Sequence, residues 1–441
     1  MYSDEVQEIL DEKSLTHGDR VSIETRENTE KGVLMPRAEQ GNNDCLVIKL
    51  ESGYNIGINI HNIEKIQKLE KKSKEPAKEM QKEKLRYDED KPDILILHTG
   101  GTIASRVSYE EGGVTPAFEP EDLLDMYPEL FEEANIESEV VAQMFSEDIE
   151  VEHWQEIAEK VAENRDKDGI IISHGTDTMH FSAAALSFML QGIDIPIVLV
   201  GSQRSSDRPS SDAAMNLISA AEFVKEGVPG VFICMHANSS DDRAAVHLGT
   251  RARKMHTSRR DAFKSIGRKP VAEVDYEKGE VEIVEPPSYE RKEEFELEER
   301  MEKDVDYMKV VPGMEKLDLE RYKSSEGLLI EGTGLGHMPV NSFDEPTEKH
   351  KEVLEELEEV AEDSLVAISS QCIHGRINMN VYDTGIKLKD AGVVSSENMV
   401  PGVAYVKLMW SIGQAETEQE AEKLFKENIA GEIQSRETVK D

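Results

Sequence analysis

From residue 91 onward, the sequence alternates between short apolar runs and longer stretches in which apolar residues recur at helical spacing. Short apolar runs bounded by glycine or proline are typical of buried strands, and apolar residues three or four positions apart are typical of amphipathic helices. This alternation favours a parallel sheet whose strands are joined by right-handed helical crossovers. We therefore predict an α/β unit over residues 92–285, with strands at Asp93–Leu97, Glu139–Met144, Gly169–Ser173, Pro196–Val200 and Gly230–Met235 and helices at Val151–Asn164, Met179–Leu190 and Asp212–Lys225.

The pattern after this unit predicts a second, smaller one. Val271–Val284 is typical of a β-hairpin that closes the first unit, and an acidic, helix-prone stretch follows at Arg291–Asp306, within a connector placed at 286–325. The second α/β unit is predicted over 326–441, with strands at Gly327–Ile330 and Ser364–Ser369 and helices near Thr347–Ala361, Ala404–Ile412 and Glu418–Asn428. The predicted fold class is therefore α/β, with two parallel-sheet units in tandem.

Residues 1–65 are predicted to form a separate domain in front of these units. Gly and Asn turns divide four short, partly alternating runs, which favours a small β-barrel; the runs are Gly18–Glu24, Lys31–Leu34, Asp44–Leu50 and Tyr54–Ile60. Residues 66–91 are strongly charged and are interpreted as a solvated linker or an exposed helix. The small domain could act as a docking module or as a nucleic-acid adaptor.

Net charge limits the partners of this chain. Its 441 residues include 91 acidic and 51 basic side chains, which gives a formal charge of −40. Such a surface repels phosphate backbones, so any nucleic-acid contact must be local or made by a partner. The acid excess also suits a salty cytoplasm, a hypothesis that would fail if the chain unfolded in molar salt and was stable without it.

Cysteine usage and hydropathy favour a soluble, cytoplasmic protein. Cys45, Cys234 and Cys372 lie far apart and form no Cys-x-x-Cys pair, which argues against a disulfide framework. The N-terminus is acidic and lacks the apolar core of a signal peptide. No apolar run approaches the roughly 20 residues that span a bilayer.

The first candidate functional motif is a Thr-Gly-Gly-Thr turn, residues 99–102, directly after the apolar run Asp93–Leu97. Gly100 and Gly101 allow a tight turn and a close approach of the backbone to a ligand. Ligands of open α/β sheets bind where strands end, so the hydroxyls of Thr99 and Thr102 would lie at such a position. Gly-rich turns also commonly follow strands that have no functional role, so this motif alone does not establish a site.

The second motif, Ser173 to Met179, again follows an apolar strand and precedes an apolar helix. Thr and Asp at a helix start are ordinary N-caps, and capping alone would explain one of them. Two threonines, an aspartate and a glycine together exceed what capping needs, so a functional role is an open alternative.

The third motif, residues 251–269, contains eight basic residues and one acid in an otherwise acidic chain. It is either a basic surface loop or a wall of the site that attracts an anionic substrate, partner or tRNA. The polar loop Ser202–Asp212 is expected at the same end of the sheet. Gly332–Gly336 has the wrong spacing for a dinucleotide turn, no P-loop is present, and His98 and His174 are interpreted as packing or hydrogen-bonding residues. We therefore expect no metal or cofactor in this chain.

Taken together, these motifs resemble the asparaginase family. Its members carry TGGTIA early in the domain, HGTDT about one strand and helix later, and a lysine further on; here these are Thr99–Ala104, His174–Thr178 and Lys254. A finer resemblance is to archaeal tRNA-dependent amidotransferases, in which the asparaginase-like component also has a small N-terminal β domain. That resemblance covers nearly the whole chain, including Gln203–Leu217, Arg251–Phe263, Gly332–His337 and Ser370–Thr384. It implies an asparaginase-like two-domain fold.

The resemblance implies amide hydrolysis through a covalent acyl intermediate, with Thr102 as nucleophile. Thr176, Asp177 and Lys254 match a second triad that positions the substrate and handles the proton. Ser146, Gly101 and Gly175 match substrate-binding positions. Glu147 stands where asparaginases often have glutamine, and Tyr109 is closer to the first motif than the family's loop tyrosine, so it is left out of the catalytic set.

A threonine hydroxyl needs a nearby base to become a nucleophile, and the sequence leaves open which group serves. The resemblance implies a partner, the E subunit of the amidotransferase, that binds ATP and Mg²⁺ and converts Glu-tRNA(Gln) to Gln-tRNA(Gln) with the released ammonia. It also implies a homodimer within a heterotetramer, with tRNA bound mainly by the partner. Glutamine and asparagine both remain possible donors, and the alternative function is a free-standing cytosolic L-asparaginase.

Overall fold

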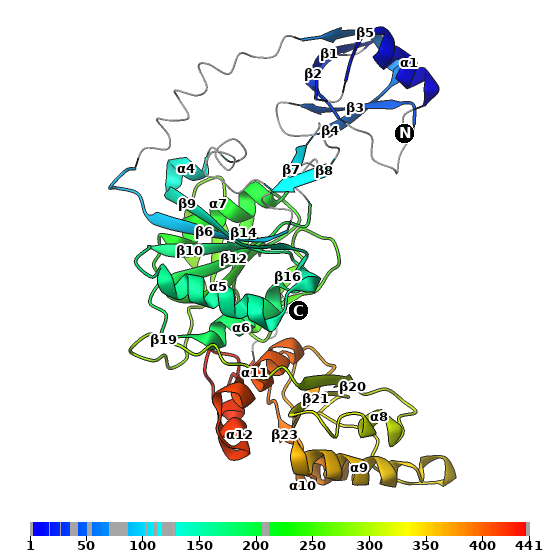
Figure 1. Ribbon diagram of the computed structural model, residues 1–441, viewed down its shortest axis with the longest axis vertical. Helices are drawn as coiled ribbons and strands as arrows, with labels where there is room; N and C mark the ends of the chain where they lie inside the picture. Colours follow the sequence, from blue (N-terminus) through cyan, green and yellow to red (C-terminus); the bar gives the residue numbers. More distant parts are fainter. Residues whose placement is uncertain are drawn as a thin grey trace.

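The computed structural model describes residues 3–16, 18–26, 28–35, 43–50, 55–69, 87–101, 105–108, 113–116, 127, 129–204 and 211–437, and Figure 1 shows the course of the chain. A small β domain precedes an α/β unit with a large mixed sheet and a second α/β unit with a smaller sheet. This arrangement agrees with the predicted fold class. In the described residues, no helix is long and apolar enough to cross a membrane.

The N-terminal domain is a five-stranded antiparallel sheet with one helix. Its elements are α1 (Asp4–Glu12), β1 (Arg20–Thr25), β2 (Thr29–Leu34), β3 (Cys45–Leu50), β4 (Asn55–Asn59), a 3-10 turn (Ile60–Asn62) and β5 (Ile63–Lys68), in the sheet order β4-β3-β2-β1-β5. Val6 and Leu10 of α1 pack in one core with Ile23 and Ile48 of the sheet. Strand β5 was not predicted, because its two isoleucines lie among charged residues. It extends the domain to Lys68, beyond the predicted boundary at residue 65.

The central sheet has eight strands, in the order β18-β17-β14-β13-β12-β10-β6-β9. Strands β9 to β13 of this order run parallel, and β14, β17 and β18 continue it antiparallel. The strands are β6 (Asp93–Gly100), β9 (Asn135–Met144), β10 (Gly169–Ser173), β12 (Pro196–Val200), β13 (Gly230–His236), β14 (Arg243–Leu248), β17 (Ala272–Asp275) and β18 (Glu280–Ile283). The last two confirm the predicted hairpin.

Helices cover both faces of this sheet (Figure 1). Helices α5 (Val151–Glu163) and α6 (Met179–Met189) pack on the face with Leu95 and Leu97, and α4 (Leu130–Glu133) and α7 (Ala213–Val224) pack on the face with Ile94 and Ile96. Shorter elements of this unit are β7 (Ser105–Ser108), β8 (Gly113–Pro116), a 3-10 turn (Ser146–Asp148), β11 (Leu190–Gln191), a 3-10 turn (Gly249–Arg251), β15 (Ala252–Lys254) and β16 (Phe263–Ser265).

The connector after this unit, residues 286–325, has no helix in its acidic part at Arg291–Asp306, so that part of the prediction was wrong. It contains β19 (Glu296–Leu297), which pairs with β11, then β20 (Val305–Lys309), which pairs with the second sheet, and the short helix α8 (Leu317–Glu320). The acidic composition favours a helix, but pairing with strands distant in the sequence overrides that weak local preference.

The second unit has a four-stranded parallel sheet in the order β20-β21-β22-β23, with β21 (Gly327–Gly332), β22 (Leu365–Ser370) and β23 (Val394–Ser395). Its remaining elements are a 3-10 turn (Glu345–Thr347), α9 (His350–Asp363), α10 (Asp383–Asp390), α11 (Pro401–Gln414) and α12 (Glu418–Lys426). Helix α11 packs between its own sheet and α6, and Trp410 stacks on Phe188 with ring centroids 5.8 Å apart. The two α/β units therefore share one hydrophobic core.

Candidate functional site

Three loops meet at the carboxyl ends of the central strands, and glycines let them approach closely. Gly100 ends β6 and Gly101 follows it, with φ values of 113° and 78°, a region that residues with side chains rarely adopt. A Cβ on Gly101 would lie 2.9 Å from the backbone nitrogen of Gly175. A Cβ on Gly175 would in turn lie 2.8 Å from the Cβ of Ser146. Glycine is thus required for backbone contact among the loops after β6, β10 and β9.

A hairpin distant in the sequence brings a lysine to these loops. Strands β15 and β16 pair antiparallel, and Lys254 ends β15. Its Nζ donates to Thr176 Oγ1 at 2.9 Å and to Asp177 Oδ1 at 2.8 Å. The Lys254 side chain is 10% exposed and that of Asp177 is 68% exposed. An ion pair with one solvent-exposed partner adds little stability, so its main effect is to place the three groups.

A buried hydrogen-bond chain holds the loop after β10. Trp154 Nε1 donates to Ser182 Oγ at 2.8 Å, and Ser182 Oγ lies 2.8 Å from His174 Nε2. His174 Nδ1 donates to the carbonyl oxygen of Gly175 at 2.7 Å, since a carbonyl can only accept. Burial lowers the pKa of His174 to about 4, so the ring is neutral at pH 7 and Nε2 accepts from Ser182. The orientation of Gly175 therefore depends on a neutral imidazole.

A second pair of bonds joins the end of β6 to β10. His98 Nδ1 lies 2.9 Å from Ser173 Oγ, and Thr99 Oγ1 donates to the carbonyl oxygen of Ser173 at 2.8 Å. Burial lowers the pKa of His98 to about 4. His98 and His174 thus make the hydrogen bonds expected of them. Among the described residues, no group of three His, Cys, Asp or Glu side chains could hold a metal ion.

These loops and the hairpin enclose a cavity of about 290 Å³. It is lined by Gly101, Phe145, Ser146, Glu147, Gly175, Thr176, Asp177, Ser202, Gln203, Lys254 and Thr257. The structure therefore brings together six residues that the sequence singled out: Gly101, Ser146, Gly175, Thr176, Asp177 and Lys254. Thr102 and Tyr109 lie outside the described residues.

Five further lining residues were not part of the predicted site. Phe145 flanks Ser146, and Ser202 and Gln203 belong to the polar loop after β12 that was expected at this end of the sheet. Glu147 had been noted only as a departure from the family pattern. Thr257 was missed as well, because nothing in its local sequence distinguishes it from other turn residues of the hairpin.

The basic stretch 251–269 forms this hairpin, and most of its charges are paired within the protein. Arg259 and Lys264 both bind Asp261, Arg260 binds Asp241, and Arg268 lies 3.6 Å from Glu285. The stretch is a wall of the cavity through Lys254 and Thr257. Internal pairing reduces the positive field that a loop of eight free cations would present.

Arg251, just before β15, is fully buried and anchors the base of the hairpin. Its Nε donates to the carbonyl oxygen of Ile266 at 2.8 Å, and its Nη1 donates to those of Asn398 at 2.6 Å and Glu432 at 3.0 Å. Its Nη2 lies 3.5 Å from Glu437 Oε1, and burial lowers the pKa of Arg251 to about 10. Residues 430–437, here called the closing segment, thereby fix the strand that carries Lys254.

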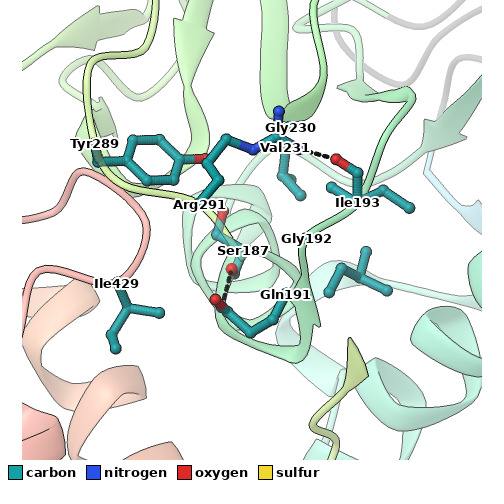
Figure 2. A pocket seen from close by; sticks show the side chains of 10 residues that line it. Ser187, Gln191, Gly192, Ile193, Gly230, Val231, Tyr289, Arg291 and Ile429 are labelled. Atoms are coloured by element: carbon teal, nitrogen blue, oxygen red, sulfur yellow. Dashed lines mark hydrogen bonds between the residues drawn. The ribbon is translucent and has the colours of Figure 1, made fainter. Parts of the chain in front are cut away.

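A second, much smaller cavity lies near the amino end of β13 (Figure 2). Figure 2 shows Gln191, Tyr289 and Arg291 around it, and Arg291 donates to the carbonyl oxygen of Ile193. Its volume of about 10 Å³ is the space of roughly one water molecule, too small for an amino acid. The 290 Å³ cavity is therefore the candidate site.

Comparison with protein families divides the chain into three matched segments. Residues 93–289 match the family described as "Asparaginase, N-terminal", and residues 304–425 match the "Glutaminase/Asparaginase C-terminal domain". Residues 15–69 match the "GatD N-terminal domain".

Several relatives that match over almost their full length are named as the D subunit of glutamyl-tRNA(Gln) amidotransferase. The protein of this name from Pyrococcus furiosus is 46% identical over 437 residues, which cover 97% of this chain and 97% of that protein. Those from Thermofilum pendens and Methanopyrus kandleri are 44% and 42% identical and cover 99% and 98% of this chain and 97% and 95% of their own lengths.

Solved structures resemble the two α/β units. The thermostable L-asparaginase from Thermococcus kodakarensis superimposes with a TM-score of 0.69 at 31% identity, covering 78% of this chain and 99% of that one. L-asparaginase I from Vibrio cholerae gives a TM-score of 0.66 at 27% identity, with the same coverage.

Proposed function

We propose, from the premise that the chain belongs to the family of glutamyl-tRNA(Gln) amidotransferase D subunits with its asparaginase-like amidase unit, that it releases ammonia from the side-chain amide of glutamine or asparagine. The observation that carries this proposal is the contact of Lys254 with both Thr176 and Asp177 in the 290 Å³ cavity. A hydroxyl, a carboxylate and an ammonium at hydrogen-bond distance can move a proton to a leaving group.

The nucleophile in this proposal is Thr102. It directly follows Gly101 in the sequence, and Gly101 lines the cavity. The hydroxyl oxygen of Thr102 attacks the carboxamide carbon of the substrate, the C–N bond breaks, and an ester with the enzyme forms. The hydroxyl proton that Thr102 loses balances the proton that the leaving nitrogen gains. Water then attacks the ester and releases the acid, which restores the hydroxyl. Splitting one difficult step into two is what covalent catalysis contributes.

The departing nitrogen must gain a proton to leave as ammonia, and Thr176 is the proposed donor. Thr176 Oγ1 accepts a hydrogen bond from Lys254, so its own proton is available to point elsewhere. Lys254 can replace that proton, and Asp177 keeps Lys254 in position. The proposed path therefore runs from Lys254 through Thr176 to the leaving nitrogen.

The charges of the cavity favour an amino acid as ligand. Two carboxylates, Asp177 and Glu147, and one ammonium, Lys254, line it. Since Lys254 is bonded to Asp177, a cationic group on the ligand complements the acidic excess. The α-ammonium of glutamine or asparagine supplies such a group, and Ser146, Gly101 and Gly175 would contact the rest of the substrate.

The second half of the reaction is assigned to a partner. We propose that the E subunit of the amidotransferase binds ATP and Mg²⁺, holds Glu-tRNA(Gln) and uses the ammonia, in a heterotetramer built on a homodimer of this chain in the cytoplasm. The names of the relatives support a multi-subunit enzyme. The net charge of −40 supports a chain that leaves most tRNA contact to its partner.

The test is ammonia release by the full chain from glutamine and from asparagine, with Thr102→Ala and Thr176→Ala. Both variants should lose turnover while their circular dichroism and unfolding curves match those of the wild type. Thr347→Ala, which removes a hydroxyl in a 3-10 turn of the second unit, is the control and should keep full turnover. Retained turnover in Thr102→Ala or in Thr176→Ala would refute the assignment.

The alternative, a free-standing L-asparaginase, is favoured by the likeness of the two α/β units to solved L-asparaginases. That likeness covers 78% of this chain, whereas the amidotransferase subunit from Pyrococcus furiosus matches 97% of it, and residues 15–69 match the GatD N-terminal domain. Turnover measured with and without the E subunit and charged tRNA separates the two functions. Strong stimulation supports the amidotransferase, and full activity of the chain alone supports the asparaginase.

A further inference from the structure

We propose that Asp241 and Arg260, acting with the buried His236, are positioning residues that join the two walls of the candidate cavity. One wall is the loop with Ser202 and Gln203, and the other is the hairpin with Lys254 and Thr257. This inference rests on the amidase function proposed above and adds residues that do not line the cavity.

The first wall is fixed by a fully buried carboxylate. Asp212 accepts from the backbone nitrogens of Gln203 at 3.0 Å and Arg204 at 2.9 Å. Asn216 Nδ2 donates to Asp212 Oδ2 at 3.2 Å and to the carbonyl oxygen of Gly201 at 2.9 Å. The backbone of the loop after β12 therefore follows the positions of Asp212 and Asn216.

His236 extends this network across the sheet. Its Nδ1 lies 2.7 Å from Asn216 Oδ1 and must be the donor, because the amide nitrogen of Asn216 already serves Asp212 and Gly201. Its Nε2 lies 3.2 Å from Asp241 Oδ1, but burial lowers the pKa of His236, so the neutral ring has no second N–H to donate to that carboxylate. The imidazole is fully buried, whereas 52% of the Asp241 side chain is exposed. The hydrogen-bond network thus runs from the buried Asp212 to His236 at the end of β13, and the backbone of the loop after β13 connects it to Asp241 at the surface.

Arg260 connects this end of the network to the second wall. Its guanidinium binds Asp241 and also donates to the carbonyl oxygen of Ser239 at 2.6 Å. Within the hairpin turn, Met255 N donates to the carbonyl oxygen of Ala262 at 2.7 Å. Since the turn is closed in this way, Arg260 fixes the tip of the hairpin, where Thr257 stands, and Arg251 anchors the strand that carries Lys254 at its other end.

The Asp241–Arg260 contact is therefore expected to align the catalytic groups while it contributes little to the free energy of folding. An exposed ion pair contributes roughly 0–1 kcal/mol to stability. A displacement of about 1 Å in a catalytic group can nevertheless cost on the order of 100-fold in rate. Removing the Asp241–Arg260 contact should therefore change turnover far more than it changes folding.

The test compares Arg260→Ala and Asp241→Ala with Arg259→Ala and Asp242→Ala in the full chain, assayed for ammonia release. The controls remove neighbouring charges whose side chains, among the described residues, bind only Asp261 and Asn238. We expect a drop of about 10-fold in kcat for the first pair, with KM and the unfolding midpoint nearly unchanged, and less than twofold for the controls.

Two further variants separate positioning from simple loss of charge. The double variant Asp241→Ala/Arg260→Ala should be no slower than either single variant, because both act through one contact. Arg260→Lys, which can still reach Asp241, should recover most of the rate. Additive losses, equal losses in the controls, or wild-type kcat in the two single variants would overturn the inference. An inactive wild-type chain would instead contradict the proposed amidase function.

Discussion

The two α/β units present the same kind of edge and use it differently. At the carboxyl ends of β6 and β10, side chains of the first unit bond to one another across a cavity, as Lys254 does with Thr176. At the carboxyl ends of β21 and β22, polar side chains bond to nearby backbone instead. Ser370 Oγ donates to the carbonyl oxygen of Gly334 at 2.5 Å, and Gln371 Nε2 donates to that of Glu331 at 3.0 Å.

This difference shows that a parallel sheet supplies a place for a site but not the site itself. Where hydroxyls and amides bond to backbone carbonyls, they fix loops and are no longer available to a ligand. Where a side chain from another segment supplies the partner, the groups stay within reach of a cavity. In the first unit, the hairpin β15–β16 supplies such a partner, the side chain of Lys254.

The largest expected effect on turnover comes from Lys254, which bonds Thr176 at the carboxyl edge of the first sheet. Lys254→Met should lower kcat for ammonia release by roughly 100- to 1,000-fold, because the second triad loses its proton source. Lys387→Met removes a lysine that bonds Asn341 beside the second edge and should stay within about twofold of the wild type. Steady-state kinetics on both variants checks this, and similar losses in both would break the comparison.

The glycines of the two edges give the next largest effect. Gly101→Ala combines φ = 78° with a Cβ 2.9 Å from the backbone of Gly175, so the loops must separate and kcat/KM should fall by roughly 10- to 100-fold. Gly334 has φ = 53° with open space around it, and Gly334→Ala should cost about 1 kcal/mol of stability while activity is kept. Equal activities for the two variants would contradict the proposed contact among the loops.

Acid should destabilise the first unit through its buried histidines. Burial lowers the pKa of His174 from its ordinary value of 6.5 to about 4 in the folded chain, so the unfolded state binds more protons between these values. The free energy of unfolding should therefore fall as pH drops from about 6.5 to about 4, by up to about 3 kcal/mol for this group. Urea unfolding across that range measures the slope.

His174→Gln is the matched variant for the acid experiment. A glutamine can keep one bond near Gly175 and Ser182 but has no proton to gain in this range. Its unfolding free energy should depend less steeply on pH than that of the wild type. An unchanged slope would show that the imidazole at the end of β10 is not responsible.

The smallest expected effect belongs to the second edge. Ser370→Ala removes one hydrogen bond to Gly334 and one from the backbone of Cys372, and should cost roughly 1–3 kcal/mol of unfolding free energy. Turnover should remain within about twofold of the wild type, since this hydroxyl only joins loops. A large loss of kcat with an unchanged unfolding curve would place a functional group at the second edge after all.

Much of this molecule could be predicted from local sequence pattern. Gly169–Ser173 and Pro196–Val200 were predicted with the bounds of β10 and β12, because continuous apolar runs between turn residues leave little choice. Thr176, Asp177 and Lys254 do converge, although the hydroxyl and the lysine are 78 positions apart. That convergence came from resemblance to a family, since spacing alone does not determine which hairpin meets which loop.

The parts that could not be predicted depend on partners distant in the sequence. Strand β5 and strand β19 are short and charged, and they exist because β1 and β11 pair with them. Arg251 belongs to a basic stretch that composition describes as exposed, yet it is fully buried and donates to two carbonyl oxygens distant in the sequence, those of Asn398 and Glu432. Local propensity carries no information about such contacts.

The closing segment has a consequence for how the enzyme is made. Thr250 donates to the carbonyl oxygen of Ala430, 180 positions later in the sequence. Arg251 donates to that of Glu432, a similar distance along the chain. At roughly 5–20 residues per second, a ribosome needs on the order of 10–40 s to bridge that distance. During this interval the strand with Lys254 lacks its anchor, so a nascent or prematurely released chain should hydrolyse no amide. We therefore expect amidase activity to begin only once residues 430–437 have been added.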